Sequence, residues 1–163
     1  MADVYVIGSA STAFTRLPDR DFRDLAREVV EGALADAGLE DGDAVDAAWF
    51  GNCAMGQWGQ DNIRGQVALT ELMRDGTLPP RLPIVNVEAG CATGSAAFQG
   101  AVKDVASGDA DISLALGVEK TWIPDDPRRT FALFSGGIDQ RHPAEWKAFF
   151  AQQGERFDVG WAP

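Results

Sequence analysis

The residues with the clearest chemical potential are a cysteine and the small residues that follow it. Cys91 comes after the apolar run 84–88 and a glycine, and it opens the stretch Cys-Ala-Thr-Gly-Ser at residues 91–95. This order predicts a strand, a sharp turn at Cys91 and a helix that begins directly after it. A thiol beside the free N–H groups and the positive dipole end of a helix is favoured as thiolate, which is the nucleophilic form. We therefore predict that Cys91 is a nucleophile whose own N–H could stabilise an oxyanion, with a small core side chain as the alternative.

The other candidate residues have weaker signals for a chemical role. Cys53 directly follows an expected strand, so we interpret it as a small packing side chain. His142, the single histidine, precedes Pro143, and a turn position is favoured over a base that activates Cys91. The loop at residues 9–12 lacks the glycine spacing of a phosphate loop, which favours a polar turn. No metal site is expected, because there is one histidine and no CxxC pair, and the acidic residues between 36 and 46 are interpreted as a solvated rim.

Composition limits the class of protein. The 163 residues are enough for one domain with a core, and 45% hydrophobic with 24% charged residues is ordinary for a globular chain. The formal net charge of -11 argues against nucleic acid or an anionic membrane surface as a partner. The sequence shows neither a secretion signal nor an apolar run of membrane length, and we expect a cytoplasmic, reduced chain.

The expected elements place Cys91 at one edge of a sheet. Apolar patterns predict strands at 4–8, 45–51, 84–88 and 111–117, with helices at 21–37, 61–74 and 92–107 between them. This β-α-β-α-β-α-β order is typical of an α/β fold with a mostly parallel sheet and helices on both faces, and the apolar run 111–117 is expected at its centre. Catalytic groups in such sheets lie beyond the carboxyl ends of strands, which favours the nucleophile interpretation of Cys91. We predict an α/β domain at 1–121 and an irregular, partly helical loop region at 122–163, with a helix from Pro143 to about residue 157.

Two stretches carry a family resemblance. Residues 85–121, VNVEAGCATGSAAFQGAVKDVASGDADISLALGVEKT, resemble the nucleophile segment of the thiolase superfamily. They are most similar to the sterol-carrier-protein thiolase branch, which is acetyl-CoA acetyltransferase-like and carries a similar E-A-x-C-A-S-G run and G-V-E-K ending. Residues 59–66, GQDNIRGQ, are similar to the G-Q-N-x-x-R-Q stretch of the same proteins. The resemblance covers residues 1–121, which correspond to the N-terminal portion of such proteins.

The resemblance implies an activity for which this sequence has only some of the residues. It implies an acyl intermediate on Cys91, (3-oxo)acyl-CoA thioesters as substrates and no bound cofactor. The Gly-His-Pro histidine and second cysteine of the family's C-terminal half have no match here, since Arg141-His142-Pro143 lacks the glycine. We therefore expect part of an acyltransferase that needs a C-terminal half or a partner subunit. The alternative is a non-catalytic thiolase-like subunit of a hetero-oligomeric thiolase or retro-aldol lyase complex. The resemblance implies a homodimer or hetero-oligomer, with an OB-fold subunit among the expected partners, rather than a lone monomer.

Overall fold

The computed structural model describes residues 3–159. The chain divides into two compact units, Met1–Trp122 and Ile123–Pro163. In chain order, the first unit contains α1 (Phe22–Asp36), β1 (Ala47–Gly51), a 3₁₀ turn (Met55–Trp58), α2 (Arg64–Arg74), β2 (Ile84–Val87), a second 3₁₀ turn (Gly90–Ala92), α3 (Thr93–Ser107) and β3 (Ser113–Gly117). The second unit contains α4 (Pro127–Ser135) and α5 (Pro143–Phe157).

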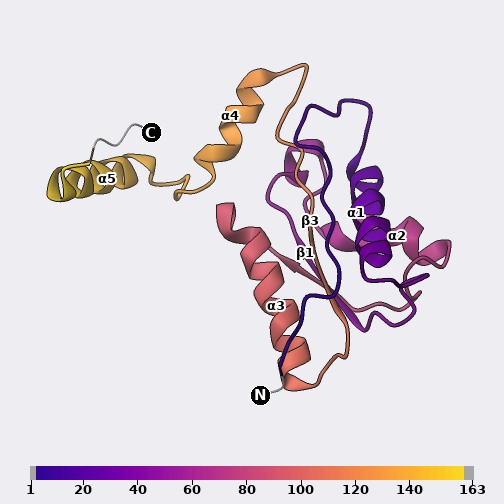
Figure 1. Cartoon of the computed structure of the whole chain (residues 1–163). Coiled ribbons are helices and arrows are strands. Elements are labelled where there is room, and N and C mark those ends of the chain that lie inside the picture. Colours follow the sequence, from indigo (N-terminus) through magenta and orange to yellow (C-terminus); the bar gives the residue numbers. More distant parts are fainter. Residues whose placement is uncertain (1–2, 160–163) are drawn as a thin grey trace. The chain divides into compact units, whose positions relative to one another are not determined.

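The first unit is an α/β layer structure around a small parallel sheet. Its strand order is β2-β1-β3, and Trp49 on β1 lies opposite Val85 on one side and Ala115 on the other. Helix α3 covers one face of the sheet, while α1 and α2 lie on the opposite side (Figure 1). The predicted α/β class with helices on both faces is thereby confirmed.

The core lies between the sheet and the pair α1 and α2. Its fully buried large side chains come from β1, α1, α2, the 3₁₀ turn after β1 and the loop after α2, and include Phe50, Met55, Leu69, Leu72, Leu78 and Val30. The opposite face packs closely on α3, because Gly100 has no side chain to hold the helix away from the Trp49 ring. Trp49 Nε1 also donates to the Asp104 carboxylate at 2.6 Å. This contact fixes α3, and with it the turn at its N-terminus, to the central strand.

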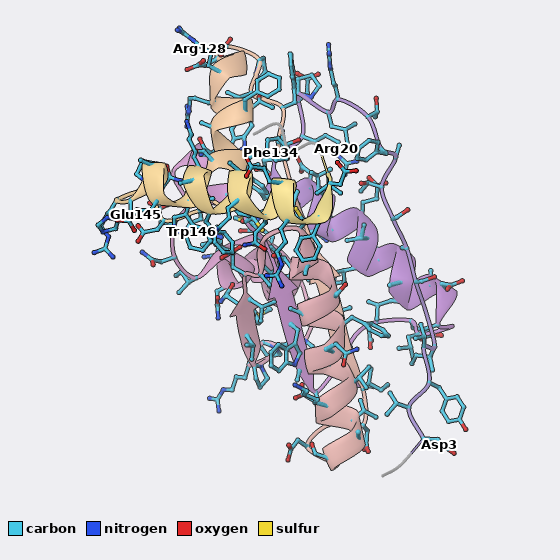
Figure 2. The ribbon with its side chains drawn as sticks, turned by 90° about the vertical axis from the view of Figure 1, so that its left-hand side faces the viewer. Asp3, Arg20, Arg128, Phe134, Glu145 and Trp146 are labelled. Carbon is cyan, nitrogen blue, oxygen red and sulfur yellow. The ribbon has the colours of Figure 1, made fainter. Side chains whose placement is uncertain are left out.

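Two strand predictions were wrong. Residues 4–8 form no strand, and Tyr5, Val6 and Ile7 are exposed. This segment, which starts near Asp3 in Figure 2, is held instead to α1, where the Ser9 N–H donates to the Asp36 carboxylate at 2.8 Å. The strand at residues 113–117 lies at the edge of the sheet rather than at its centre, because β1 is the strand with a neighbour on each side. An apolar pattern indicates that a segment could be a buried strand. Whether the strand forms, and where it lies in the sheet, depends on its pairing with other strands.

The helix ends follow the predicted capping signals with one exception. Asp21 caps α1 through a reciprocal capping box with Asp24, and Gly108 ends α3 in the left-handed conformation at φ 82°. Helix α2 begins at Arg64 and not at Asp61. Ile63 precedes it at φ 45° and ψ 41°, a left-handed conformation that is unusual for a β-branched residue.

The second unit is helical. Pro143 begins α5 as predicted, and Trp146 contacts the rings of Phe149 and Phe150 along that helix. Helix α4 falls in the stretch expected to be irregular, and Asp126 caps it by accepting from the Arg128 N–H. Figure 2 shows Phe134 on α4 and Glu145 and Trp146 on α5.

Candidate active site

The carboxyl ends of the three parallel strands meet at one edge of the sheet. Asn52 follows β1, Glu88 follows β2, and Val118 and Glu119 follow β3. The Asn52 side chain is buried and donates through Nδ2 to the Val118 carbonyl, while its Oδ1 accepts from the Met55 N–H at 2.8 Å. Asn52 therefore ties the end of β1 to the end of β3. No sequence signal singled it out, because its role depends on which strand lies beside β1.

Cys91 lies on the turn that joins β2 to α3. It sits in the 3₁₀ turn Gly90–Ala92, immediately before Thr93, the first residue of α3, and it is exposed. Gly90 makes the bend possible at φ 56°, a conformation that glycine adopts without cost. A helix of 15 residues begins at Thr93, two residues after Cys91, so the turn that carries the thiol leads directly into the positive end of the helix dipole. This placement matches the position predicted for the nucleophile.

Thr93 holds the turn in shape. Its buried hydroxyl accepts from the Ala89 N–H at 2.8 Å and donates to the Gly90 carbonyl at 2.7 Å. The Glu88 carboxylate adds a second link by accepting from the Gly90 N–H at 2.6 Å. On the other side, a Cβ on Gly51 would lie 2.9 Å from the Thr93 methyl carbon, so only glycine at the end of β1 admits this side chain. The turn is therefore fixed by local hydrogen bonds and by the neighbouring strand.

Cys53 lies beside the same turn. Its sulfur is 3.0 Å from Thr93 Oγ1, 3.2 Å from the Gly90 carbonyl oxygen and 3.5 Å from Glu88 Oε1. Burial is the main cause that raises the pKa of the Cys53 thiol, and the nearby carboxylates of Glu119 and Glu88 raise it further. Cys53 is therefore held as the neutral thiol at a pH where an unperturbed cysteine begins to ionise. The predicted position near the end of the sheet is correct, but the contacts with the Cys91 turn were not foreseen.

Glu119 supports the loop that carries Cys53. Its carboxylate oxygens accept from the backbone N–H groups of Cys53 and Ala54, the second at 3.0 Å. Burial raises the pKa of Glu119 above its ordinary value, and these two N–H donors partly offset that rise. The carboxylate therefore binds the end of β3 to the loop after β1. The sequence signal for this residue was its place directly after a strand, within the G-V-E-K ending.

An open pocket of about 320 Å³ lies between the ends of β1 and β2 and the loop before α2. Polar groups line it, among them Asn86, Glu88 and Arg64. Arg64 reaches back to the strand end, where its guanidinium donates to the Asn52 carbonyl at 2.7 Å. The pocket therefore reaches Glu88, just before the Cys91 turn, and offers both hydrogen-bond donors and acceptors.

The remaining candidate, His142, belongs to the second unit. It is the residue that precedes α5, and its Nδ1 lies 3.7 Å from a Glu145 carboxylate oxygen. This is the turn position that the sequence predicted. Within the described residues, no three His, Cys, Asp or Glu side chains are arranged to hold a metal ion. Across residues 3–159, no helix combines the length and apolar character that crossing a bilayer requires.

Comparison with known proteins identifies the family. Residues 4–125 match the family described as "Thiolase, N-terminal domain". An acetyl-CoA acetyltransferase of Methanothermobacter thermautotrophicus is 40% identical over 157 residues, which are 96% of this chain and 37% of that protein. The benzoylsuccinyl-CoA thiolase subunit BbsB of Thauera aromatica is 31% identical over 94% of this chain and 37% of its own length.

The branch predicted from the motifs is also found among these relatives. Sterol carrier protein 2 of Bos taurus is 38% identical over 119 residues, covering 72% of this chain and 20% of that protein. The chain thus spans little more than a third of the length of the acetyltransferase and thiolase relatives named above.

Proposed function

Because the chain belongs to the thiolase family through its N-terminal domain, we propose that it is the nucleophile-bearing part of an acyltransferase that acts on 3-oxoacyl-CoA thioesters. The observation that carries the proposal is the position of Cys91. It is an exposed thiol at the N-terminus of α3, just beyond the carboxyl end of β2. The names of the acetyltransferase and thiolase relatives support the reaction class.

In the proposed reaction Cys91 accepts the acyl group. Its thiolate attacks the ketone carbon of the 3-oxoacyl-CoA, and the bond between the ketone carbon and the adjacent methylene carbon breaks. The acyl group stays on the Cys91 sulfur as a thioester, and the departing acetyl-CoA carbanion takes up a proton. The thiolate of a second coenzyme A then attacks the Cys91 thioester, which releases the shortened acyl-CoA and restores the Cys91 thiolate.

The chain's own residues supply the setting for the nucleophile. The N-terminus of α3 favours the negative charge that develops on the tetrahedral intermediate. Thr93 and Glu88 hold the turn, so that the thiol approaches the substrate from a fixed backbone. Preorganisation of this kind avoids the cost of arranging the donors during the reaction.

The proton transfers require a general acid and a general base in addition to Cys91. The only histidine of the sequence, His142, is exposed and precedes α5. Arg141 stands before it, where the family's Gly-His-Pro motif has glycine. We assign the acid and base to a C-terminal half or to a partner polypeptide. Without them the chain would bind an acyl group on Cys91 but turn over slowly, because general acid–base groups contribute roughly 100- to 10,000-fold to such steps.

The test is a matched pair of cysteine variants in the complete assembly. Cys91→Ala should abolish thiolysis of a 3-oxoacyl-CoA, because the acyl acceptor is lost. Cys53→Ser is the control, since it replaces the other thiol beside the same turn by a hydroxyl, which can still form hydrogen bonds there. Thiolysis that persists at the wild-type rate in Cys91→Ala would refute the proposed role.

A second function has one observation in its favour. BbsB, to which the chain is 31% identical, is named as a thiolase subunit, which supports a place for this chain in a hetero-oligomer. In this alternative the chain is a non-catalytic subunit that shapes the substrate pocket of a complete thiolase or retro-aldol lyase. Native mass spectrometry of the complex purified from its source distinguishes the two, when combined with Cys91→Ala. A hetero-oligomer that keeps full activity in the variant favours the non-catalytic subunit.

A further inference from the structure

The first unit holds two free cysteines whose surroundings overlap. Cys53 follows β1 and Cys91 follows β2, two strands that are direct neighbours in the sheet. Both therefore reach the same edge of the sheet, although they are far apart in the sequence. We propose that Cys53 and Cys91 form a reversible disulfide under oxidising conditions, which blocks the candidate nucleophile and protects it from irreversible oxidation.

The contacts of Cys53 place its sulfur against the backbone next to Cys91. The sulfur lies 3.2 Å from the carbonyl oxygen of Gly90, the residue bonded directly to the Cys91 nitrogen. It also lies 3.0 Å from the hydroxyl of Thr93, two residues beyond Cys91. Since a carbonyl oxygen is about 3 Å from the next Cα by standard backbone geometry, the Cys53 sulfur lies at most about 6 Å from the Cys91 Cα. A disulfide then requires the Cys91 side chain to rotate toward Cys53, because the two sulfurs must come to bonding distance.

The space beside the turn is open at Gly90. Gly90 adopts φ 56°, and no other atom lies within 4 Å of the position that a side chain on it would occupy. Cys91 is exposed, so a small oxidant reaches it from solvent, while Cys53 is partly covered. The exposed thiol is thus the site of attack, and the covered thiol is the one that resolves the oxidised product.

The chemistry balances with hydrogen peroxide as the two-electron oxidant. The Cys91 thiolate attacks one peroxide oxygen, the O–O bond breaks, and Cys91 becomes a sulfenic acid while hydroxide leaves and takes up a proton. The Cys53 sulfur then attacks the Cys91 sulfur, and the proton of Cys53 passes to the hydroxide that leaves. The S–O bond breaks, the leaving hydroxide is protonated to water, and the disulfide remains. Two thiols are oxidised, one peroxide is reduced to two waters, and a dithiol restores both thiols.

The test uses the whole polypeptide treated with a small excess of hydrogen peroxide and digested with trypsin without reduction. We expect residues 28–64 and 82–103, the tryptic peptides of Cys53 and Cys91, to be recovered as one linked species that separates on reduction. In Cys53→Ser the Cys91 peptide should instead gain the mass of two or three oxygen atoms, which reduction does not remove.

Two results would overturn the proposal. One is a wild-type chain in which Cys53 stays open to alkylation while Cys91 is oxidised to the sulfinic acid. The other is a Cys91 disulfide that joins two chains and forms equally well in Cys53→Ser. Both readouts are chemical and need no catalytic activity, so they remain decisive if Cys91 is not the acyl acceptor.

Discussion

Replacing Thr93 by valine tests whether its hydroxyl holds the Cys91 turn. Valine has nearly the same shape, so the methyl contact with Gly51 is kept, while the hydroxyl's hydrogen bonds with Ala89 and Gly90 and its contact with the Cys53 sulfur are lost. The Ala89 N–H and the Gly90 carbonyl then have no partner from this side chain. Thr93→Ser is the matched variant, because it keeps the hydroxyl and removes only the methyl group.

The expected cost follows from the hydrogen bond between the Ala89 N–H and the hydroxyl. Loss of a partner for a partly buried backbone group costs about 1–3 kcal/mol, so local opening of the turn should become easier by that amount in Thr93→Val. Each 1.4 kcal/mol is a tenfold change in an equilibrium constant, which gives a roughly 5- to 150-fold increase in the open population. Thr93→Ser should lose about 1 kcal/mol of global stability from the missing methyl and leave the turn closed.

Hydrogen exchange at the Ala89 amide measures this directly, because that N–H is bonded to the Thr93 hydroxyl. We expect exchange to be faster in Thr93→Val by the factor above and close to wild type in Thr93→Ser. Alkylation of Cys91 by iodoacetamide provides a second readout, since a loosened turn moves the thiol away from the helix N-terminus. Equal exchange at Ala89 in both variants would refute the role assigned to the hydroxyl.

Two further predictions concern the packing and the pH dependence of the same unit. Gly100→Ala should lower the free energy of unfolding in urea by about 1–3 kcal/mol, because the new methyl meets the Trp49 ring on β1. Gly94→Ala in the same helix has open space and should be neutral or slightly stabilising. Equal effects of the two substitutions would contradict the observed docking of α3. For Glu119, burial raises the folded pKa above the ordinary value of 4.5, so its contribution to stability is fully present below that value and is lost as the pH rises through the folded pKa. The free energy of unfolding of the wild type relative to Glu119→Gln should therefore fall as the pH rises above 4.5, and a difference that does not change with pH would contradict the raised pKa.

The sequence predicted those elements whose signals are local. The capping box at Asp21, the glycine after α3 and the proline at the start of α5 act within a few residues, and the structure has all three. Helix α4 was missed although the pair Asp126-Pro127 is a capping residue followed by an N1 proline. The glycines, prolines and charged residues around this pair are typical of irregular structure, and they favoured the prediction of a loop.

The elements that failed depend on partners far away in the chain. The apolar pattern of residues 4–8 is compatible with a strand, but no described strand pairs with it, and Tyr5 is 76% exposed. The position of β3 at the edge follows from the pairing of β1 with β2 and β3, which no local pattern contains. Strand formation requires a neighbour, so periodicity alone could not decide either point.

The candidate site also combines features that local sequence predicted and features that it did not. The turn at Cys91 and the helix after it follow from a local order of apolar, glycine and small residues, and their geometry was predicted. The contacts of Asn52, Cys53 and Glu119 join the ends of different strands, and they could be found only once the strand order was known. The catalytic role of Cys91 stays a prediction.

The most direct test of the central proposal is to trap the acyl group. The complete protein is incubated with an isotope-labelled acyl-CoA without free coenzyme A, quenched in acid and digested, and the peptide 82–103 is analysed by mass spectrometry. We expect the labelled acyl group on Cys91 in the wild type and in Cys53→Ser, released by hydroxylamine, and none in Cys91→Ser. A label that is absent from Cys91 in the wild type, or found on Cys53 instead, would contradict the proposed acyl acceptor.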